Sequence, residues 1–131
     1  MANTFNHAFA TIGNYFRIFA GAGFPVREFK AGDVIFKQGD AAAELFIIQS
    51  GEVEIRLGNR RLEKLSNYNF FGEMALIDSA PRSATAVAVT DVKLVPVGEK
   101  QFLFLVSNTP YFALNVMRIL ARRLRTTNNT L

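Results

Sequence analysis

Residues 45–59 read LFIIQSGEVEIRLGN, and this stretch decides the fold class. Its first four residues, 45–48, are all apolar, which predicts a short strand that is buried on both faces. After Gly51 the pattern changes, because residues 53–57 alternate aliphatic and charged side chains as a half-buried strand does. Gly58-Asn59 then fits a two-residue hairpin loop. The stretch therefore predicts consecutive strands joined by tight turns.

The same pattern extends in both directions, from Val26 to Val97. Gly32-Asp33 and Gly39-Asp40 mark turns on the N-terminal side. Residues 84–89 and 92–97 predict two further strands on the C-terminal side. Many short strands at regular spacing favour an antiparallel β-roll of the jelly-roll type, also called a double-stranded β-helix.

Helical periodicity flanks this β region on both sides. One apolar stripe precedes it and predicts an N-terminal amphipathic helix, which either packs on the domain or forms a partner or dimer surface. After the β region, residues 99–106 predict a short helix. Thr109-Pro110 then predicts the start of a second helix that runs to about Arg125. The polar residues 126–130 are expected to fray. The N-terminal stripe consists of Phe5, Phe9, Ile12, Phe16 and Phe19.

The C-terminal helix has two apolar faces, and so it must cover something: the roll, a ligand or another copy. One face carries Leu114, Met117, Ala121 and Leu124; the neighbouring face carries Phe112, Val116, Ile119 and Leu120. We expect one domain over 1–131, with a helical segment at 1–25, the β-roll at 26–98, helices at 99–127 and a tail at 128–131.

Composition narrows the classes of function. Half of the 131 residues are apolar and none is cysteine, which excludes disulfides and thiolate chemistry. The net charge of +4 comes largely from arginines near the C-terminus, so the body of the domain is not expected to bind nucleic acid. The first charged residue is Arg17, and no basic start of a secretory signal is visible; a cytoplasmic protein is therefore expected.

The residues with the clearest chemical potential lie in one run, 71–85, which reads FGEMALIDSAPRSAT. Gly72 lets a ligand approach the backbone closely. A short helix predicted over 73–78 presents free N–H groups at its start. Arg82 can bind a phosphate through two parallel hydrogen bonds, and Glu73 offers an acceptor for sugar hydroxyls. Taken singly, each of these residues more often has a structural role; their order along the chain favours a sugar-phosphate site.

This run resembles the phosphate-binding cassette of cyclic-nucleotide-binding domains, and it is most similar to that of bacterial cyclic-nucleotide-gated potassium channels. The family pattern is F-G-E, an apolar residue, A-L, an apolar residue, a variable stretch, then P-R, a small residue, A, T or S, and V. Ala86 departs from the final valine, and Val87 follows it. The segments AGDVIF at 31–36, QGD at 38–40 and the run from 45 to 53 resemble the family's first strands.

The resemblance implies the roles of the site residues. Arg82 would bind the exocyclic phosphate oxygens, Glu73 would accept from the ribose 2′-OH, and Ser83 would reach the phosphate. Ser83 stands at the position where, in the family, threonine favours cGMP and alanine favours cAMP. We expect cAMP to bind more tightly than cGMP. The ligand-binding residues implied are Phe71, Gly72, Glu73, Met74, Ala75, Arg82, Ser83 and Ala84.

The C-terminal run ARRLRTT, 121–127, is similar to the start of the dimer helix of the catabolite activator family. There, hydroxyl residues contact the adenine; in channel-type domains an arginine does so. Arg122, Arg123 and Thr127 are thus candidates to cover the base. The alternative for each is a solvated position at a basic helix end.

No group in the sequence suggests catalysis, since His7 is the only histidine and no nucleophile–base pair is evident. We expect a non-catalytic sensor without cofactor or metal, which relays occupancy through its C-terminal helix to an unknown effector. A homodimer through the C-terminal or the N-terminal helix is one option, and the sequence does not decide the oligomeric state. Two alternatives remain: a degenerate β-roll that serves only as an interaction module, and a nucleic-acid binder that uses the basic helix.

Overall fold

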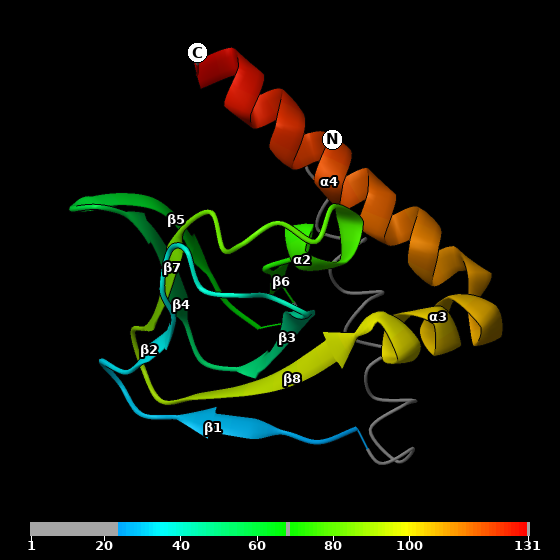
Figure 1. Cartoon of the computed structure of the whole chain (residues 1–131), viewed down its shortest axis with the longest axis horizontal. Helices are drawn as coiled ribbons and strands as arrows, with labels where there is room; N and C mark the ends of the chain where they lie inside the picture. Colours follow the sequence, from blue (N-terminus) through cyan, green and yellow to red (C-terminus); the bar gives the residue numbers. More distant parts are fainter. Residues whose placement is uncertain (1–23, 68, 131) are drawn as a thin grey trace.

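The computed structural model describes residues 24–67 and 69–130, with the backbone alone for 126–130. The predicted N-terminal helix, with its stripe from Phe5 to Phe19, lies outside the described residues. Two four-stranded antiparallel sheets face each other (Figure 1). One sheet has the order β1-β8-β3-β6 and the other β2-β7-β4-β5. The predicted antiparallel β-roll is therefore confirmed.

The strands lie between residues 27 and 98. Two helices follow them in the chain, and a single helical turn lies among the later strands. The strands are β1 (Arg27–Phe29), β2 (Val34–Phe36), β3 (Glu44–Ser50), β4 (Val53–Leu57), β5 (Arg60–Leu65), β6 (Phe70–Phe71), β7 (Thr85–Ala88) and β8 (Val92–Gly98). The helices are α2 (Met74–Ile77), α3 (Glu99–Asn108) and α4 (Pro110–Thr130).

Strand β3 lies at the centre of the molecule, as its continuous apolar run predicts. Its alternate residues face two different cores. Phe46 and Ile48 pack between the two sheets, against residues of β4, β7 and β8. Leu45 and Ile47 point the other way, toward the helices. Burial on both faces thus explains why this strand carries no polar alternation.

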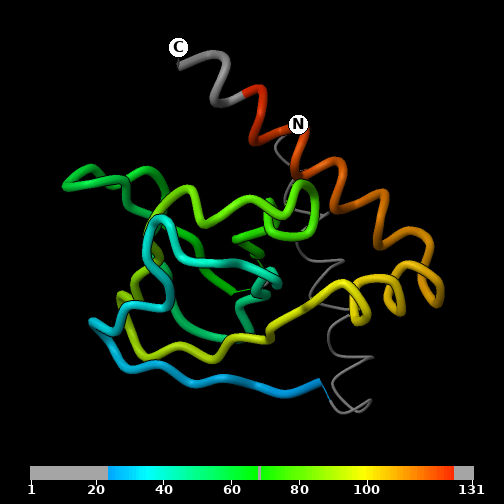
Figure 2. The backbone as a smooth tube through the Cα atoms, in the orientation of Figure 1, coloured from blue at the N-terminus to red at the C-terminus, as the bar shows by residue number. Residues whose placement is uncertain are grey.

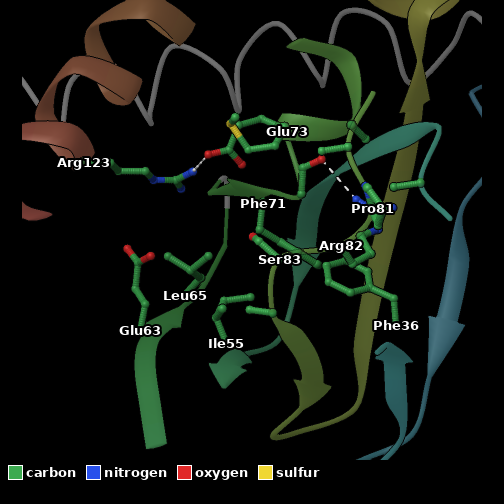
Figure 3. A pocket seen from close by; sticks show the side chains of 16 residues that line it. Phe36, Ile55, Glu63, Leu65, Phe71, Glu73, Pro81, Arg82, Ser83 and Arg123 are labelled. Atoms are coloured by element: carbon green, nitrogen blue, oxygen red, sulfur yellow. Dashed lines mark hydrogen bonds and ion pairs between the residues drawn. The ribbon is translucent and has the colours of Figure 1, made fainter. Parts of the chain in front are cut away.

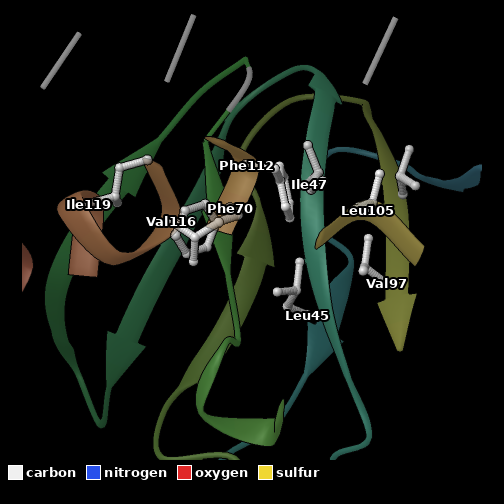
Figure 4. Close-up of a cluster of buried hydrophobic side chains, with 9 residues drawn as sticks. Leu45, Ile47, Phe70, Val97, Leu105, Phe112, Val116 and Ile119 are labelled. Atoms are coloured by element: carbon white, nitrogen blue, oxygen red, sulfur yellow. The ribbon is translucent and has the colours of Figure 1, made fainter. Parts of the chain in front are cut away.

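The second core joins the outer face of one sheet to α3 and α4 (Figure 4). Leu105 of α3 and Phe112, Val116 and Ile119 of α4 pack against β3, β6 and β8. This is one of the two predicted apolar faces of the C-terminal helix. On the other face, Met117 and Leu124 are 58% and 62% exposed.

One predicted boundary is wrong. Helix α4 continues to Thr130, so the predicted helix end and the tail at 128 were placed too early in the chain. No glycine or proline follows Pro110, so nothing in the sequence stops the helix, although its last residues are polar. The short helix predicted over 73–78 is present as a single turn, Met74–Ile77, and the chain leaves the helical conformation at Asp78.

The path of the chain brings three distant segments together above the open end of the roll. In Figure 2 the β4–β5 hairpin projects on one side, the α2 turn lies in the middle, and α4 runs past that turn on the other side. The cavity described next lies among these three segments.

Candidate functional site

A cavity with about 620 Å³ of empty space, including its open mouth, lies between the run 71–84 and the β4–β5 hairpin. We call residues 71–84 the cassette wall. Ile55, Glu63 and Leu65 form the opposite side, which we call the hairpin wall, and Arg123 enters from α4 (Figure 3). The remaining lining residues outside the cassette wall are Phe36 and Ala42.

The backbone of Arg82 is fixed by the turn between β2 and β3. Its N–H donates to the carbonyl of Asp40 at 2.9 Å, and its carbonyl accepts from Gly39 N–H at 2.8 Å. Gly39 has a φ of 90°, the left-handed conformation that this turn requires. The predicted QGD turn therefore sets the position of the arginine, although it is more than 40 residues away in sequence from it.

The Arg82 side chain is only 8% exposed. Its guanidinium lies over the Phe36 ring at 4.0 Å from the centroid. Nη1 donates to Gly72 O at 3.1 Å and Nη2 to Glu44 O at 2.8 Å, whereas Nε has no hydrogen-bond partner in the described part of the chain. Burial lowers the pKa of Arg82, and the nearby Glu44 and Asp40 carboxylates oppose that shift. The result is a rigid, poorly solvated cation at the cavity surface.

Gly72 is the point where the backbone comes closest to this cation. Its φ is 76°, and a Cβ at this position would lie 2.5 Å from Arg82 Nη1. Both the conformation and the space therefore require glycine. Gly72 was predicted to let the backbone approach a bound group closely. In the structure, the group that the backbone approaches is the side chain of Arg82.

Glu73 connects the cassette wall to α4. Its carboxylate accepts from Arg123 Nη1 at 3.0 Å, and the two side chains are only 17% and 18% exposed. Arg123 Nη2 donates to the carbonyl of Phe70, and the guanidinium lies 4.6 Å from the Phe70 ring centroid. This largely buried arginine thus links the last helix to the cassette, in addition to the packing of Leu76 on the core that contains Val116 and Ile119.

All of the cassette residues implied by the resemblance line the cavity; their roles remain predictions. Ser83 is exposed. The two residues that could bind a phosphate, Arg82 and Ser83, are adjacent in the chain. Of the three candidates to cover the base, Arg123 lines the cavity, Arg122 does not, and the side chain of Thr127 is not among those described. The eight cassette residues are Phe71, Gly72, Glu73, Met74, Ala75, Arg82, Ser83 and Ala84.

The hairpin wall was not predicted from the sequence. Ile55 belongs to a strand whose inward face was predicted, but Glu63 and Leu65 lie on β5, where no motif marks them. The register supplies the signal: Ile55 is directly opposite Glu63, so the two side chains share one face of the sheet.

Two further properties concern the described residues as a whole. Within residues 24–67 and 69–130, no helix has an apolar stretch sufficient for a bilayer span. Over the same ranges, no three histidine, cysteine, aspartate or glutamate side chains gather into a set that could hold a metal ion.

Comparison with known proteins gives a family match over most of the β-roll. Residues 26–109 match the family model described as the cyclic nucleotide-binding domain. The cyclic AMP receptor protein of Thermus thermophilus is 40% identical over 107 residues, which cover 78% of this chain and 50% of that protein. A cGMP-dependent protein kinase of Toxoplasma gondii is 39% identical over 75 residues, 57% of this chain and 8% of the kinase.

Solved structures agree with this match. The crystal structure of Thermus thermophilus catabolite activator protein superposes with a TM-score of 0.75 at 34% identity, covering 95% of this chain and 57% of that one. This chain spans about half the length of the first curated relatives that it matches.

Proposed function

The chain belongs to the cyclic nucleotide-binding domain family, and from this premise we propose that its cavity binds cAMP in preference to cGMP. We propose further that it is a non-catalytic sensor whose occupancy is relayed through α4. A cytoplasmic location and the absence of enzymatic activity stay predictions from the sequence.

The observation that carries the proposal is the pairing of Arg82 and Glu73 in one cavity. The two groups are suited to different parts of a cyclic nucleotide. A guanidinium forms short, charge-assisted hydrogen bonds with phosphate oxygens, and a carboxylate accepts from sugar hydroxyls. The apolar side chains of Ile55 and Leu65 offer a surface for a purine ring on the opposite side.

Support for the relay comes from the contact between Glu73 and Arg123. The same carboxylate that would accept from the ribose 2′-OH is bonded to α4, so a ligand and the helix share one acceptor. A ligand can shift the position of α4 only by the difference between its affinities for the two arrangements.

A second copy of the chain is the partner that the exposed face of α4 suggests. Met117 and Leu124 lie seven residues apart, two turns along the same helix face, and both are mostly exposed. Sedimentation equilibrium should show a dimer for the native chain and a monomer for Met117→Glu, because a buried carboxylate at the interface is unfavourable. A monomeric native chain at all concentrations would refute this partner.

Titration calorimetry with cAMP tests the main proposal. Removing Arg82 should weaken binding by about 1.5–3 kcal/mol, the scale of hydrogen bonds to a charged group, which is about 10- to 150-fold in Kd. Arg118→Ala is the matched control, because Arg118 is an exposed arginine of α4 that does not line the cavity. Equal affinities of Arg82→Ala and the native chain would exclude the assigned role.

The role of Glu73 is separable with an analogue in the same assay. Glu73→Ala should weaken cAMP but change the affinity for 2′-deoxy-cAMP much less, because that analogue lacks the hydroxyl. A native chain that binds neither cAMP nor cGMP would instead favour the degenerate interaction module.

A further inference from the structure

In strand β5, one of the two leucines is exposed although a glutamate lines the cavity. The strand's only two apolar residues are Leu62 and Leu65; the ladder pairs Leu65 with Val53 but skips Leu62, at the register shift between Glu63 and Arg61. Leu65 is buried, whereas Leu62 is 48% exposed. The charged Glu63, next to Leu62, is a cavity-lining residue. Leu62 and Glu63 are thus both exposed, but of the two only Glu63 lines the cavity.

The pairing with β4 fixes this orientation. Glu63 is directly opposite Ile55, and both residues line the cavity with Leu65. Lys64, which points the other way, pairs with Glu54 in the ladder and forms an ion pair with Glu52 at 2.9 Å. Rotating β5 to bury Leu62 would break this register and expose Leu65.

Among the described charged residues that line the cavity, Glu63 is the one whose side chain makes no hydrogen bond or ion pair. Of the charged residues that line the cavity, Glu73 and Arg123 bond to each other, and Arg82 bonds to two carbonyls. In the described part of the chain, no hydrogen bond or ion pair involves the Glu63 carboxylate. Figure 3 shows it on the side of the cavity away from Arg82, below Arg123.

We propose that Glu63 selects the base of the bound nucleotide by accepting a hydrogen bond from the 6-amino group of adenine. This inference rests on the proposed function, because Arg82 and Glu73 must hold the phosphate and ribose at the cassette wall. The purine then extends toward the hairpin wall, and its 6-substituent is far from the glycosidic nitrogen.

A carboxylate at this place discriminates by charge and by hydrogen-bonding type. An ionised carboxylate only accepts hydrogen bonds. At the 6-position it therefore bonds to an amino group but meets the lone pairs of a 6-oxo group, as in guanine or hypoxanthine. The discrimination requires that the carboxylate face this position and not the adjacent N1–H of those two bases. A glutamine would lose this discrimination, because its amide can donate to an oxo group or accept from an amino group.

The experiment compares cAMP with cyclic inosine monophosphate, which has hypoxanthine in place of adenine, and with cGMP. Titration calorimetry of the native chain, Glu63→Gln and Glu63→Ala gives the ratio of affinities for each pair of ligands. The ratio is the readout because removal of a negative charge near an anionic ligand raises all affinities together. The preference for cAMP over the hypoxanthine analogue should fall by about tenfold in both variants, the lower end for a charged hydrogen bond at an exposed position.

Glu54→Gln is the matched control. It removes the same charge from the adjacent strand of the same hairpin, but Glu54 does not line the cavity. Its ratios should equal those of the native chain.

A fall of less than about threefold in both Glu63 variants, with native binding intact, overturns the role of Glu63 and leaves the proposed function standing. If the native chain binds none of the three nucleotides, the proposed function itself fails, and the inference fails with it.

Discussion

The cassette wall and the hairpin wall enclose the same cavity but are built in different ways. The cassette wall is one continuous run of 14 residues, and its polar groups are positioned by main-chain contacts over short distances. The hairpin wall is assembled from β4 and β5, with Arg123 reaching in from α4, and depends on strand register and helix packing. A motif can specify the first wall; only the tertiary fold specifies the second.

This difference suggests a division of roles. The group common to all cyclic nucleotides, the sugar-phosphate ring, would meet the wall that the motif specifies. The base, which differs among these ligands, would meet the wall that sequence changes can alter without disturbing the cassette. Variants on the two walls should therefore have separable effects, on overall affinity and on base preference.

The largest effect is expected at Gly72 of the cassette wall. Gly72→Ala should lower the free energy of unfolding by about 1–2 kcal/mol, the scale of strain for a Cβ at positive φ. Its Cβ would also displace the Arg82 guanidinium, which lies 2.5 Å away. The affinity for cAMP should thus fall by about 10- to 150-fold, as for loss of Arg82 itself. Urea denaturation and calorimetry measure the two effects.

Gly32→Ala separates strain from displacement. Gly32 does not line the cavity, has a φ of 91° and has no heavy atom within 4 Å of an added Cβ. This variant should show a similar loss of stability, whereas its cAMP affinity should stay within about threefold of the native value. Equal losses of affinity in the two alanine variants would show that the space beside Arg82 is not what matters.

A smaller effect is expected at the contact between α4 and the cassette. A double-mutant cycle with Glu73→Gln and Arg123→Met should give a coupling of about 1–2 kcal/mol in the free energy of unfolding, because both side chains are largely buried. The pair Lys64–Glu52, with side chains 46% and 39% exposed, is the comparison and should give at most about 0.5 kcal/mol. Coupling no larger than in that surface pair would mean that Arg123 does not hold α4 in place.

The sequence predicted best those features that depend on neighbours along the chain. The apolar run 45–48, the hairpin loop at 58–59 and the cassette residues were all in reach, because burial on both faces, tight turns and the motif are local. The end of α4 was misplaced because polar composition was given more weight than the absence of a helix-stopping residue.

There is a physical reason why the sequence alone does not predict that Glu63 lines the cavity. In RRLEKL, 60–65, the two leucines are three residues apart, and so an alternating pattern cannot bury both. Which of them faces inward is decided by pairing with β4, where the register shifts between Ile55 and Arg56. A shift of this kind is a property of two strands together and leaves no mark in either strand alone.

The two carbonyl bonds of Arg82 limit how its guanidinium can meet an anion. Each Nη carries two N–H groups, and one bond from Nη1 goes to Gly72 O and one from Nη2 to Glu44 O. An anion therefore bonds to the N–H groups that these carbonyls leave over, or it displaces a carbonyl that then needs another donor. Substitutions that alter how Gly72 or Glu44 holds the guanidinium should tune anion affinity without touching the ligand.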